Sequence, residues 1–584
     1  MPTAAHDNSA VQADSEFSVA EIFAIRGLNT NDNAISLNTD EMTAFTNYMI
    51  GPRFIRRRLG CVSTGTPPTG LTSIKGFGHM EQDSGTTLMF LGSNGTLYKL
   101  GSGTWSATDK TNYDVTNDAV MATFTSKSGN SVETGTSTAG TTKYLIEDAS
   151  KNWTPGAYQG KCVVIAGEVK YIADNTKTTL FLSDRLNSDT DSDYQTKAYA
   201  IHAIAPMLFV SNGVDSVQKY NLTAHVAIDG THVTGGEAMQ KFRHMAVHQG
   251  RLWGAKGSGN DNDRVSISDV AVGEQFTKDT NLNINLQFMN DGDDVTGLAS
   301  LPLTNGSVLL VTKNESVHTV EGDNVLNYAT HARYAKDGCI APKTLKVSGR
   351  SALMLGYNGI IRFSGDGGTE LLEKPIPVSE AIDPDLAAIA LATRRAACAE
   401  IWNNRYYLCI SGTMYVYDIL ESIRRQQHIW SILEFPWDID WVHAAGNVLY
   451  GGRNSNGQIY QLFSGNTDNG ERITATMETS WVTFPGAPVT CVDRIEIPAD
   501  KNTGVVLRLA YAVDGGAYSS YVVATLDKDL GVYRFPIKDR GTSFKFKLID
   551  NATTDPVRIA MPIRIFFSVD TFGERDTAAN LTHL

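Results

Sequence analysis

The chain has 584 residues and a formal net charge of −13. This length suits about three or four domains. An acidic chain is a poor candidate for tight, non-specific DNA binding, because such binding needs clustered Lys and Arg to neutralise phosphates. DNA passing nearby is not excluded, since a negative wall would repel a duplex and let it slide. The N-terminus shows no secretory signal pattern. No apolar run approaches the ~20 residues of a membrane helix, so we expect no stable membrane insertion.

The cysteines form no C-x-x-C pair and no Cys/His cluster with zinc spacing. We therefore expect free, buried thiols in a reducing compartment, and we expect no metal and no cofactor. The six positions are Cys61, Cys162, Cys339, Cys398, Cys409 and Cys491.

The chain begins with a polar run, and we expect residues 1–22 to form a flexible N-terminal arm. From about residue 71 it consists of short apolar runs that end at Gly, Asn or Asp, which is typical of β-strands joined by tight turns. One unit recurs about seven times: it consists of a strand, a turn and a second strand that ends in an aromatic residue. The units lie at 87–100, 206–220, 245–255, 306–320, 351–365, 405–418 and 447–462.

A single hairpin cannot bury its apolar face in water. Repetition around a closed ring solves this problem, because each sheet packs on the next and few edges stay open. The repeats therefore predict an all-β protein built on a β-propeller of six to eight blades. Asn94-Gly95 and Asn358-Gly359 suit type I′ turns, which need positive φ at both central residues.

Composition and strand length divide the chain further. Residues 23–106 and 201–465 are expected to form the propeller, and residues 107–200 a small inserted β domain with Trp153 as a core anchor. The main helical pattern is 378–397, where Ser379 suits a cap and Pro384 suits a first helical position. Longer strands in 466–584 predict a C-terminal β-sandwich and tail.

Two acidic loops are candidate calcium sites. Asp189, Asp191 and Asp193 resemble the start of a calcium loop, but Tyr194 and Ala200 stand where Gly and Glu are needed. The run 290–294 (NDGDD) is first of all a turn, whose Asp side chains satisfy local N–H groups. For both loops a solvated turn is favoured over a calcium site.

Propellers also host glycosidases, which place two carboxylates beside the scissile bond. Asp438 and Asp440, next to Trp437 and Trp441, are the candidates here, because residues two apart in a strand face the same way. The favoured interpretation is an aromatic blade edge that packs on its neighbour. No standard catalytic motif is present in the sequence, so we expect a non-enzymatic protein.

Several segments, in order along the chain, resemble the tail tubular or nozzle proteins of short-tailed bacteriophages. The start of that family is matched by Gly27-Leu28-Asn29, then by Asn47 and the basic element Arg56-Arg57-Arg58-Leu59-Gly60. Leu59 stands in place of the family's usual Pro. Similar segments follow at 248–255, 264–276, 290–298, 357–368 and 414–430, and DRGTSFKFKL with Arg575 matches the family's end. The unit ASKNWTPGAYQGKCVVI is similar to a module of phage tail and baseplate proteins.

The resemblance implies a structural virion protein of the viral tail, assembled in the host cytoplasm. Such a subunit forms a ring, commonly a homohexamer, below the portal and adaptor rings. The ring conducts genomic DNA during ejection without sequence-specific binding, and it offers attachment surface to tail fibres. The alternatives are a receptor-binding or glycan-processing tail protein and a cellular propeller scaffold that binds proteins through its loops.

The cluster Arg56, Arg57 and Arg58 has two interpretations. One is phosphate contact with passing DNA. The other, which we favour, is a subunit-interface or adaptor contact in which the arginines pair with acidic loops of a neighbouring copy, since Arg forks suit carboxylates. One short cluster in an acidic chain is weak support for nucleic-acid recognition.

Overall fold

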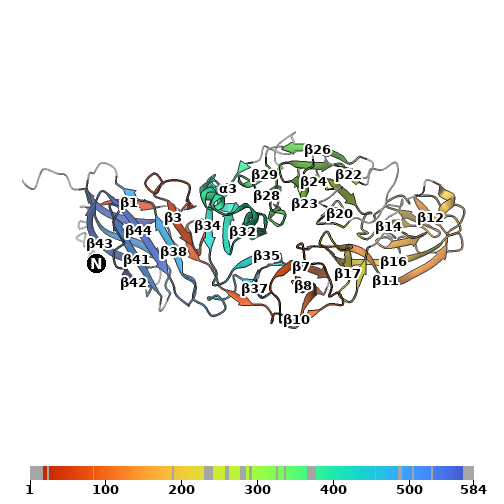
Figure 1. Ribbon diagram of the computed structural model, residues 1–584, viewed down its shortest axis with the longest axis horizontal. Helices are drawn as coiled ribbons and strands as arrows, with labels where there is room; N and C mark the ends of the chain where they lie inside the picture. The colour runs from red at the N-terminus through yellow and green to blue at the C-terminus, as the bar shows by residue number, and fades with distance from the viewer. Residues whose placement is uncertain are drawn as a thin grey trace, which may run out of the picture.

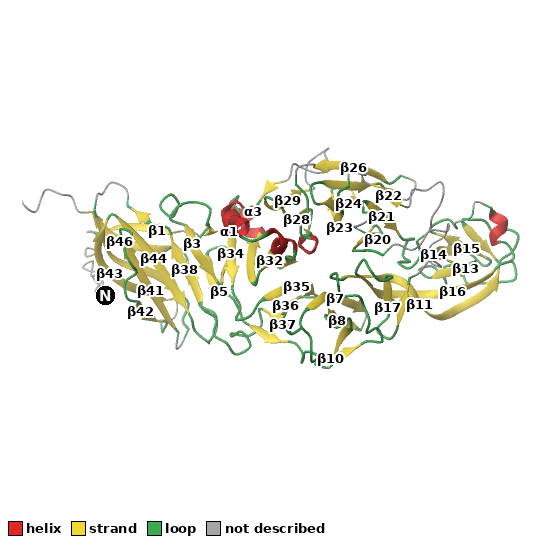
Figure 2. Ribbon diagram, viewed as in Figure 1, coloured by secondary structure: helices red, strands yellow, loops and turns green. Residues whose placement is uncertain are grey.

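The computed structural model describes residues 17–569 except 23–24, 83, 187, 189, 229–240, 257–261, 277–284, 288–291, 305, 324–326, 335–336, 365–375, 454, 485–488, 503–504 and 528–530. Figure 1 shows an elongated molecule with a β-sandwich at one end, a ring of sheets in the middle and a small β unit at the other end. Strands dominate all three parts; the α-helices lie beside the ring, and one short helical turn lies in the small β unit (Figure 2).

Within the described residues, five four-stranded antiparallel sheets stand alone as blades of a propeller-like ring. Their strands are β7 (Ile74–Gln82), β8 (Gly85–Gly92), β9 (Leu97–Gly101) and β10 (Thr104–Ala107); β19 (His244–His248), β20 (Arg251–Ala255), β21 (Arg264–Ile267) and β22 (Asn285–Gln287); β23 (Val295–Leu303), β24 (Gly306–Lys313), β25 (Val317–Glu321) and β26 (Ala329–Tyr334); β27 (Lys346–Ser348), β28 (Ser351–Gly356), β29 (Gly359–Ser364) and β30 (Ile376–Pro377); and β35 (Ile439–Ala445), β36 (Val448–Arg453), β37 (Ile459–Leu462) and β6 (Cys61–Ser63).

Five separate blades are fewer than the six to eight expected from the repeats. The reason is that two further four-strand runs do not end at the rim of the ring but continue into larger sheets. One run contains β11 (Val120–Thr136), β16 (Ala198–Ser211), β17 (Gln218–Tyr220) and β18 (His225–Ala227), and the other contains β31 (Cys398–Trp402), β32 (Arg405–Ile410), β33 (Thr413–Asp418) and β34 (Trp430–Leu433). The first strands of all these sheets contact one another in the order β7, β11, β19, β23, β27, β31, β35 and back to β7.

The ring is closed by a strand that precedes it in sequence. β6 pairs antiparallel with β37, so that Val62 lies opposite Gln461 at the outer edge of the last sheet. Without β6 this outer edge would present unpaired backbone groups to solvent. The N-terminal segment therefore completes the last blade.

The small β unit is an extension of the second blade. β11 and β16 pair along their whole length, with bulges between Ser128 and Glu133, and their outer halves carry β12 (Leu145–Glu147), β13 (Cys162–Ile165), β14 (Glu168–Asn175) and β15 (Thr179–Leu182). The expected boundaries at 107 and 200 are therefore wrong, because residues 120–128 pair with 203–211 inside the blade. Trp153 is buried in the core of this unit, as expected of an anchor.

The C-terminal region forms a β-sandwich, but N-terminal strands belong to it as well. One sheet contains β1 (Ser18–Ile22), β4 (Tyr48–Ile50), β5 (Phe54–Arg57), β40 (Thr490–Ala499), β43 (Gly531–Gly541), β45 (Arg558–Ala560) and β46 (Ile563–Val569). The other contains β2 (Gly27–Leu28), β3 (Glu41–Thr46), β38 (Ala475–Thr479), β39 (Val482–Thr483), β41 (Val506–Val513), β42 (Val522–Thr525) and β44 (Ser543–Asp550), and β3 joins it to β34 of the propeller.

Two expected boundaries change as a result. Residues 18–22 of the expected flexible arm form β1, which pairs with β46, and the remainder of the arm lies outside the described residues apart from Phe17. The sequence predicts residues 25–57 to be part of the propeller, but in the structure they belong to the sandwich. Phe45, Tyr48 and Ile55 pack in the same apolar core as Phe535 and Phe546.

Helices in the described ranges are short: α1 (Asp383–Ala388), α2 (Leu391–Arg395), α3 (Ile419–Arg425) and the 3₁₀ turns η2 (Asp191–Tyr194), η5 (Pro342–Thr344) and η6 (Glu380–Ile382). Pro384 lies in the first turn of α1 but is its second residue, one position later than predicted. The Ser379 hydroxyl donates to Asp383 and makes no capping hydrogen bond to η6, the turn that follows it. None of the described helices is long and apolar enough to span a bilayer.

Two local predictions can be compared directly. The six cysteines are free and five of them are buried, as predicted. The Asn-Gly turns are not type I′, because φ is positive at Gly95 and Gly359 but not at Asn94 or Asn358. Asn94 and its glycine instead share a turn in which the Asn94 side chain accepts a hydrogen bond from the Thr96 N–H.

Candidate functional site

Arg58 lies buried where the N-terminal segment, the propeller and the sandwich meet. Its guanidinium forms a two-pronged ion pair with Asp468, at 2.7 and 2.6 Å. Nε donates to the Asn47 side chain at 2.8 Å, and the remaining N–H groups reach the carbonyls of Leu59 and Glu434. All five donors of the guanidinium are thus used within the chain.

Arg57 is buried one residue away and points into the sandwich. It donates to the carbonyls of Ala552 (2.6 Å) and Thr554 (2.7 Å). Its Nε lies 2.9 Å from Asp550 Oδ2, an ion pair that is not aligned as a hydrogen bond. Burial raises the pKa of Asp550, although the charge of Arg57 acts in the opposite direction.

These positions correct the predicted role of the arginine cluster. Arg57 and Arg58 cannot reach a neighbouring subunit or passing DNA, because their side chains are fully buried and their carboxylate partners belong to the same chain. Only Arg56 is exposed. It lies directly opposite Arg558 on the neighbouring strand, so two like charges share one face of the sheet.

Other residues that carry the family resemblance lie at the same junction. Asn47 adopts a positive φ of 60° and donates through its side chain to the Thr474 carbonyl. Gly60 passes so close to Thr467 that a Cβ there would lie 1.9 Å from its carbonyl oxygen. Gly27 has a φ of 94° and equally little room beside Trp430. This part of the motif shapes the junction, and Arg575 lies outside the described residues.

The acidic loops make local contacts. Asp191 accepts the Lys143 N–H at 2.8 Å, and Tyr194 is buried with its hydroxyl on Glu168. Asp293 accepts from the Asn314 side chain and the Glu315 N–H. Asp189 and residues 290–291 lie outside the described residues. Across the described ranges, no group of three or more His, Cys, Asp or Glu is arranged to hold a metal ion.

The tryptophan–aspartate segment does not form a sugar platform. Asp438 precedes β35, and a register shift between Ile439 and Trp441 breaks the alternation on which the prediction depended. Trp437 stacks on Tyr460 at 4.5 Å, while Trp441 is buried and donates to the Ile74 carbonyl. Trp441 therefore packs between the last blade and the first, as the favoured interpretation expects, whereas Trp437 packs within its own blade on β37.

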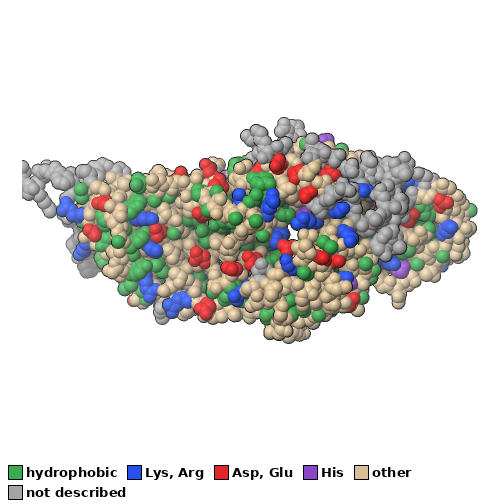
Figure 3. All heavy atoms as spheres, in the orientation of Figure 1, with side chains coloured by type: hydrophobic (Ala, Val, Ile, Leu, Met, Phe, Trp, Pro, Cys, Tyr) green, Lys and Arg blue, Asp and Glu red, His purple; other side chains and the backbone are tan. Residues whose placement is uncertain are grey.

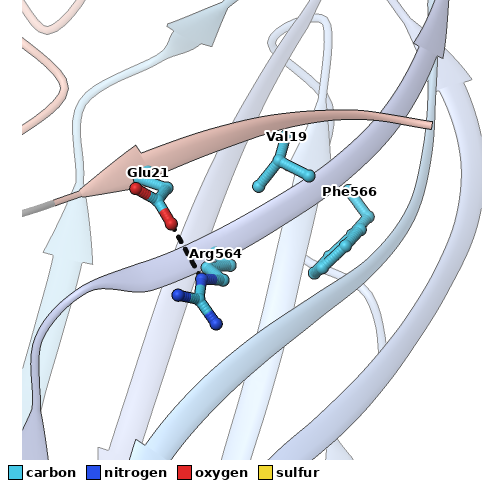
Figure 4. A pocket seen from close by; sticks show the side chains of 4 residues that line it. All are labelled: Val19, Glu21, Arg564 and Phe566. Carbon is cyan, nitrogen blue, oxygen red and sulfur yellow. Dashed lines mark hydrogen bonds and ion pairs between the residues drawn. The ribbon is translucent and has the colours of Figure 1, made fainter. Parts of the chain in front are cut away.

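A shallow hollow on the sandwich lies between β1 and β46 and has a volume of about 430 Å³. Val19, Glu21, Arg564 and Phe566 line it, and Figure 4 shows Glu21 and Arg564 joined across the strands, at 2.8 Å. This exposed ion pair holds the N-terminal strand in register. It provides neither a nucleophile nor a paired acid and base.

The larger cavity lies at the centre of the propeller and has a volume of about 480 Å³. All seven first strands of the ring contribute to its wall. Its polar lining includes Asp118, Arg243, His244, Lys343, Lys346, Arg395 and His443. In Figure 3, Lys and Arg side chains gather around a hollow near the middle of the face drawn.

Charged groups around this cavity are tightly coupled. Lys346 pairs with Glu400 at 3.2 Å, and His443 Nδ1 lies 3.5 Å from the same carboxylate. Burial acts to raise the pKa of Glu400, but Lys346 and His443 outweigh it and lower the pKa to about 2. His443 Nε2 also lies 2.7 Å from His79 Nδ1, which links the last blade to the first. Burial lowers the pKa of His244 to about 3.

Sequence reasoning missed this cavity. Its cations come from three separate segments, around Arg243, around Lys343 and Lys346, and around Arg395, so no local motif marks the set. The only available signal was the position of each residue on or beside the first strand of a hairpin unit, which in a propeller lines the central channel.

No protein-family model matches the sequence, and comparison with curated proteins finds no match. Among solved structures, the chain is similar to the computationally designed Ika8 protein, with 9% identity over 69% of this chain and 99% of that chain and a TM-score of 0.34. It is also similar to BamB from Moraxella catarrhalis, with 10% identity over 76% of this chain and 97% of that chain and a TM-score of 0.33. An exo-beta-1,3-galactanase from Phanerochaete chrysosporium has 10% identity, coverage of 62% and 92%, and a TM-score of 0.25. Similarities this low carry no argument about function.

We predict that Arg58→Ala destabilises the protein by about 3–5 kcal/mol, because it leaves the Asp468 carboxylate buried without a partner. Arg56→Ala is the matched control and should change the free energy of unfolding by less than about 0.5 kcal/mol, since Arg56 is exposed. Urea unfolding followed by tryptophan fluorescence measures both. Equal stability of the two variants would contradict the role given to the junction.

A second prediction concerns pH. The folded-state pKa of His244 is lowered, so the unfolded chain binds a proton that the folded protein excludes, and stability falls as pH decreases from about 6.5 toward 3. His244→Gln should reduce this slope by about 1.4 kcal/mol per pH unit. The exposed His331→Gln is the control. Unfolding midpoints between pH 7 and pH 4 test this, and an unchanged slope in His244→Gln would refute it.

Proposed function

We propose that this chain is a structural virion protein, a tail nozzle subunit whose copies form a ring-shaped channel for DNA ejection. The observation that carries the proposal is the elongated body in which the buried ion pair of Arg58 and Asp468 joins propeller and sandwich (Figure 1). A second buried pair, Arg57 with Asp550, lies within the sandwich. We infer from these pairs that the body is stiff. A subunit that holds tail fibres at a fixed position relative to an adaptor ring needs such stiffness. An enzyme instead needs several reactive groups placed close together in one site. The order of the resembling segments from residue 27 to 575 supports the same proposal.

The small β unit is also held firmly. Lys170 of β14 pairs with Asp269 beside the third blade at 2.8 Å, and Arg251 of β20 pairs with Asp184 at 2.9 Å. Lys170, Asp269 and Arg251 are buried. Removing one partner of such a pair is costly, because an unpaired buried charge remains. The unit is therefore suited to act as a fixed arm of the subunit.

We infer that the ring has seven blades. The two four-strand runs β11–β16–β17–β18 and β31–β34 count as blades, because their first strands occupy places in the closed circuit of contacts. Each run only continues beyond the rim, into the small β unit in one case and into the sandwich in the other.

The exposed pair Arg56 and Arg558 is our candidate contact with a neighbouring copy or with the adaptor. Like charges directly opposite each other in a sheet are destabilising. Arg558 has a carboxylate of its own chain nearby, Asp500 at 3.8 Å, so Arg56 is the arginine that an acidic partner would contact. In a homohexameric ring that partner would come from the next subunit of this acidic chain. The portal or adaptor ring, the tail fibres and the transported genomic DNA are the other proposed partners.

The glycan-processing alternative gains no support from the geometry of Asp438 and Asp440, because the register shift in β35 breaks their alternation.

Electron microscopy of purified virions tests the proposal. We expect a ring of this fold in the tail, and mass photometry of the purified protein should detect oligomers of about six copies. A stable monomer that is absent from virions would contradict the nozzle function.

We further predict that Arg56→Glu reduces ring assembly at least several-fold, while leaving the fold intact, because an acidic partner would repel the new charge. Lys177→Glu makes the same change of charge at an exposed site in the small β unit and should assemble normally. Oligomer fractions by mass photometry provide the measurement. Unchanged assembly of Arg56→Glu would move the subunit contact elsewhere.

A further inference from the structure

The central cavity of the propeller holds more positive charge than nearby carboxylates neutralise. Arg243, Lys343, Lys346 and Arg395 line it, and Lys75 lies 3.9 Å from Asp118 at its edge. Asp118 and Glu400 are the carboxylates that pair with these cations among the described residues. An enclosed site with surplus cations attracts anions strongly, because low-dielectric walls concentrate the field.

Arg243 is the most available of these cations. It is half-buried, directly precedes β19, and makes no ion pair with another residue that the structure describes. Its neighbour His244 is buried and is held neutral by a lowered pKa, so it adds no competing charge at neutral pH. A guanidinium presents paired N–H donors that match two oxygens of a phosphate group.

The two lysines are already positioned by other groups. Lys343 Nζ lies 2.7 Å from Asp118 and 4.2 Å from the centre of the Trp441 ring. Lys346 is fixed by Glu400. Each ammonium group has three donors, so a carboxylate partner leaves donors for an incoming anion. Fixed donors lose little conformational entropy on binding.

We propose that the propeller cavity binds a multiply charged phosphate group of a small molecule, with Arg243, Lys343 and Lys346 as the contacting cations. About 480 Å³ lies within the range of small-molecule sites. The remaining wall, which includes Phe77, Met245 and Leu298, suits an apolar or aromatic group attached to the phosphate. A cavity of this size excludes duplex DNA. The proposal does not rest on the nozzle function and stands or falls separately.

Isothermal titration calorimetry of the full chain with pyrophosphate tests the site at physiological salt. We expect one site per chain and an affinity that falls about tenfold or more in Arg243→Gln. Lys177→Gln removes one positive charge at an exposed site in the small β unit, outside the cavity lining, and should bind like the unmodified protein. Circular dichroism establishes that both variants are folded, and Lys343→Gln supplies a second cavity variant.

The outcomes separate clearly. Binding that weakens in both cavity variants but not in Lys177→Gln supports the site. Titration with a nucleoside triphosphate then identifies the source, since tighter binding than pyrophosphate indicates a nucleotide and equal or weaker binding indicates inorganic phosphates. Absence of pyrophosphate and triphosphate binding overturns the proposal. Equal losses in the cavity variants and in Lys177→Gln, or no loss in either cavity variant, also overturn it, because the anion would then bind the general surface.

Discussion

The buried ion pair between Arg58 and Asp468 is the interaction on which the junction of propeller and sandwich depends. Arg58 follows β5 of the sandwich, Asp468 follows the last blade, and Asn47 and Glu434 are the other acceptors apart from the adjacent Leu59 carbonyl. Each acceptor comes from a different segment, so the guanidinium can be satisfied only when all of them are in place. A buried charge pair contributes less to net stability than its attraction suggests, but it penalises every arrangement that separates its partners.

The closure of the ring follows from this junction. β6 begins three residues after Arg58 and pairs with β37, so the segment that is fixed at the junction also completes the last blade. Cys61 supports the same arrangement, since its thiol lies 3.5 Å from Asp468. Sandwich, junction and propeller are therefore parts of one body. The central cavity, whose wall needs all seven first strands, depends on that closure.

Local patterns were sufficient to predict the strands and the propeller-like ring. Alternating apolar residues between turns specify hairpins, and hairpins such as 351–364 appear where the sequence placed them. The sandwich boundary could not be predicted, because β1 pairs with β46 across more than five hundred residues and only tertiary packing decides that partnership. The burial of Arg57 and Arg58 was missed for the same reason: a run of three arginines is typical of a surface, and their carboxylate partners lie about four to five hundred residues away. The cavity likewise brings together cations from separate blades, which no spacing rule detects.

Native-state hydrogen exchange at increasing denaturant tests the central claim, that propeller and sandwich are one cooperative body joined at Arg58. Amides of the closing pair β6–β37 and of the sandwich strand β44 should exchange through one shared opening reaction. Their free energies of opening and the denaturant dependence of those free energies should then be the same. Two separate opening reactions, in which β44 exchanges at a denaturant concentration that leaves β6 and β37 protected, would contradict it.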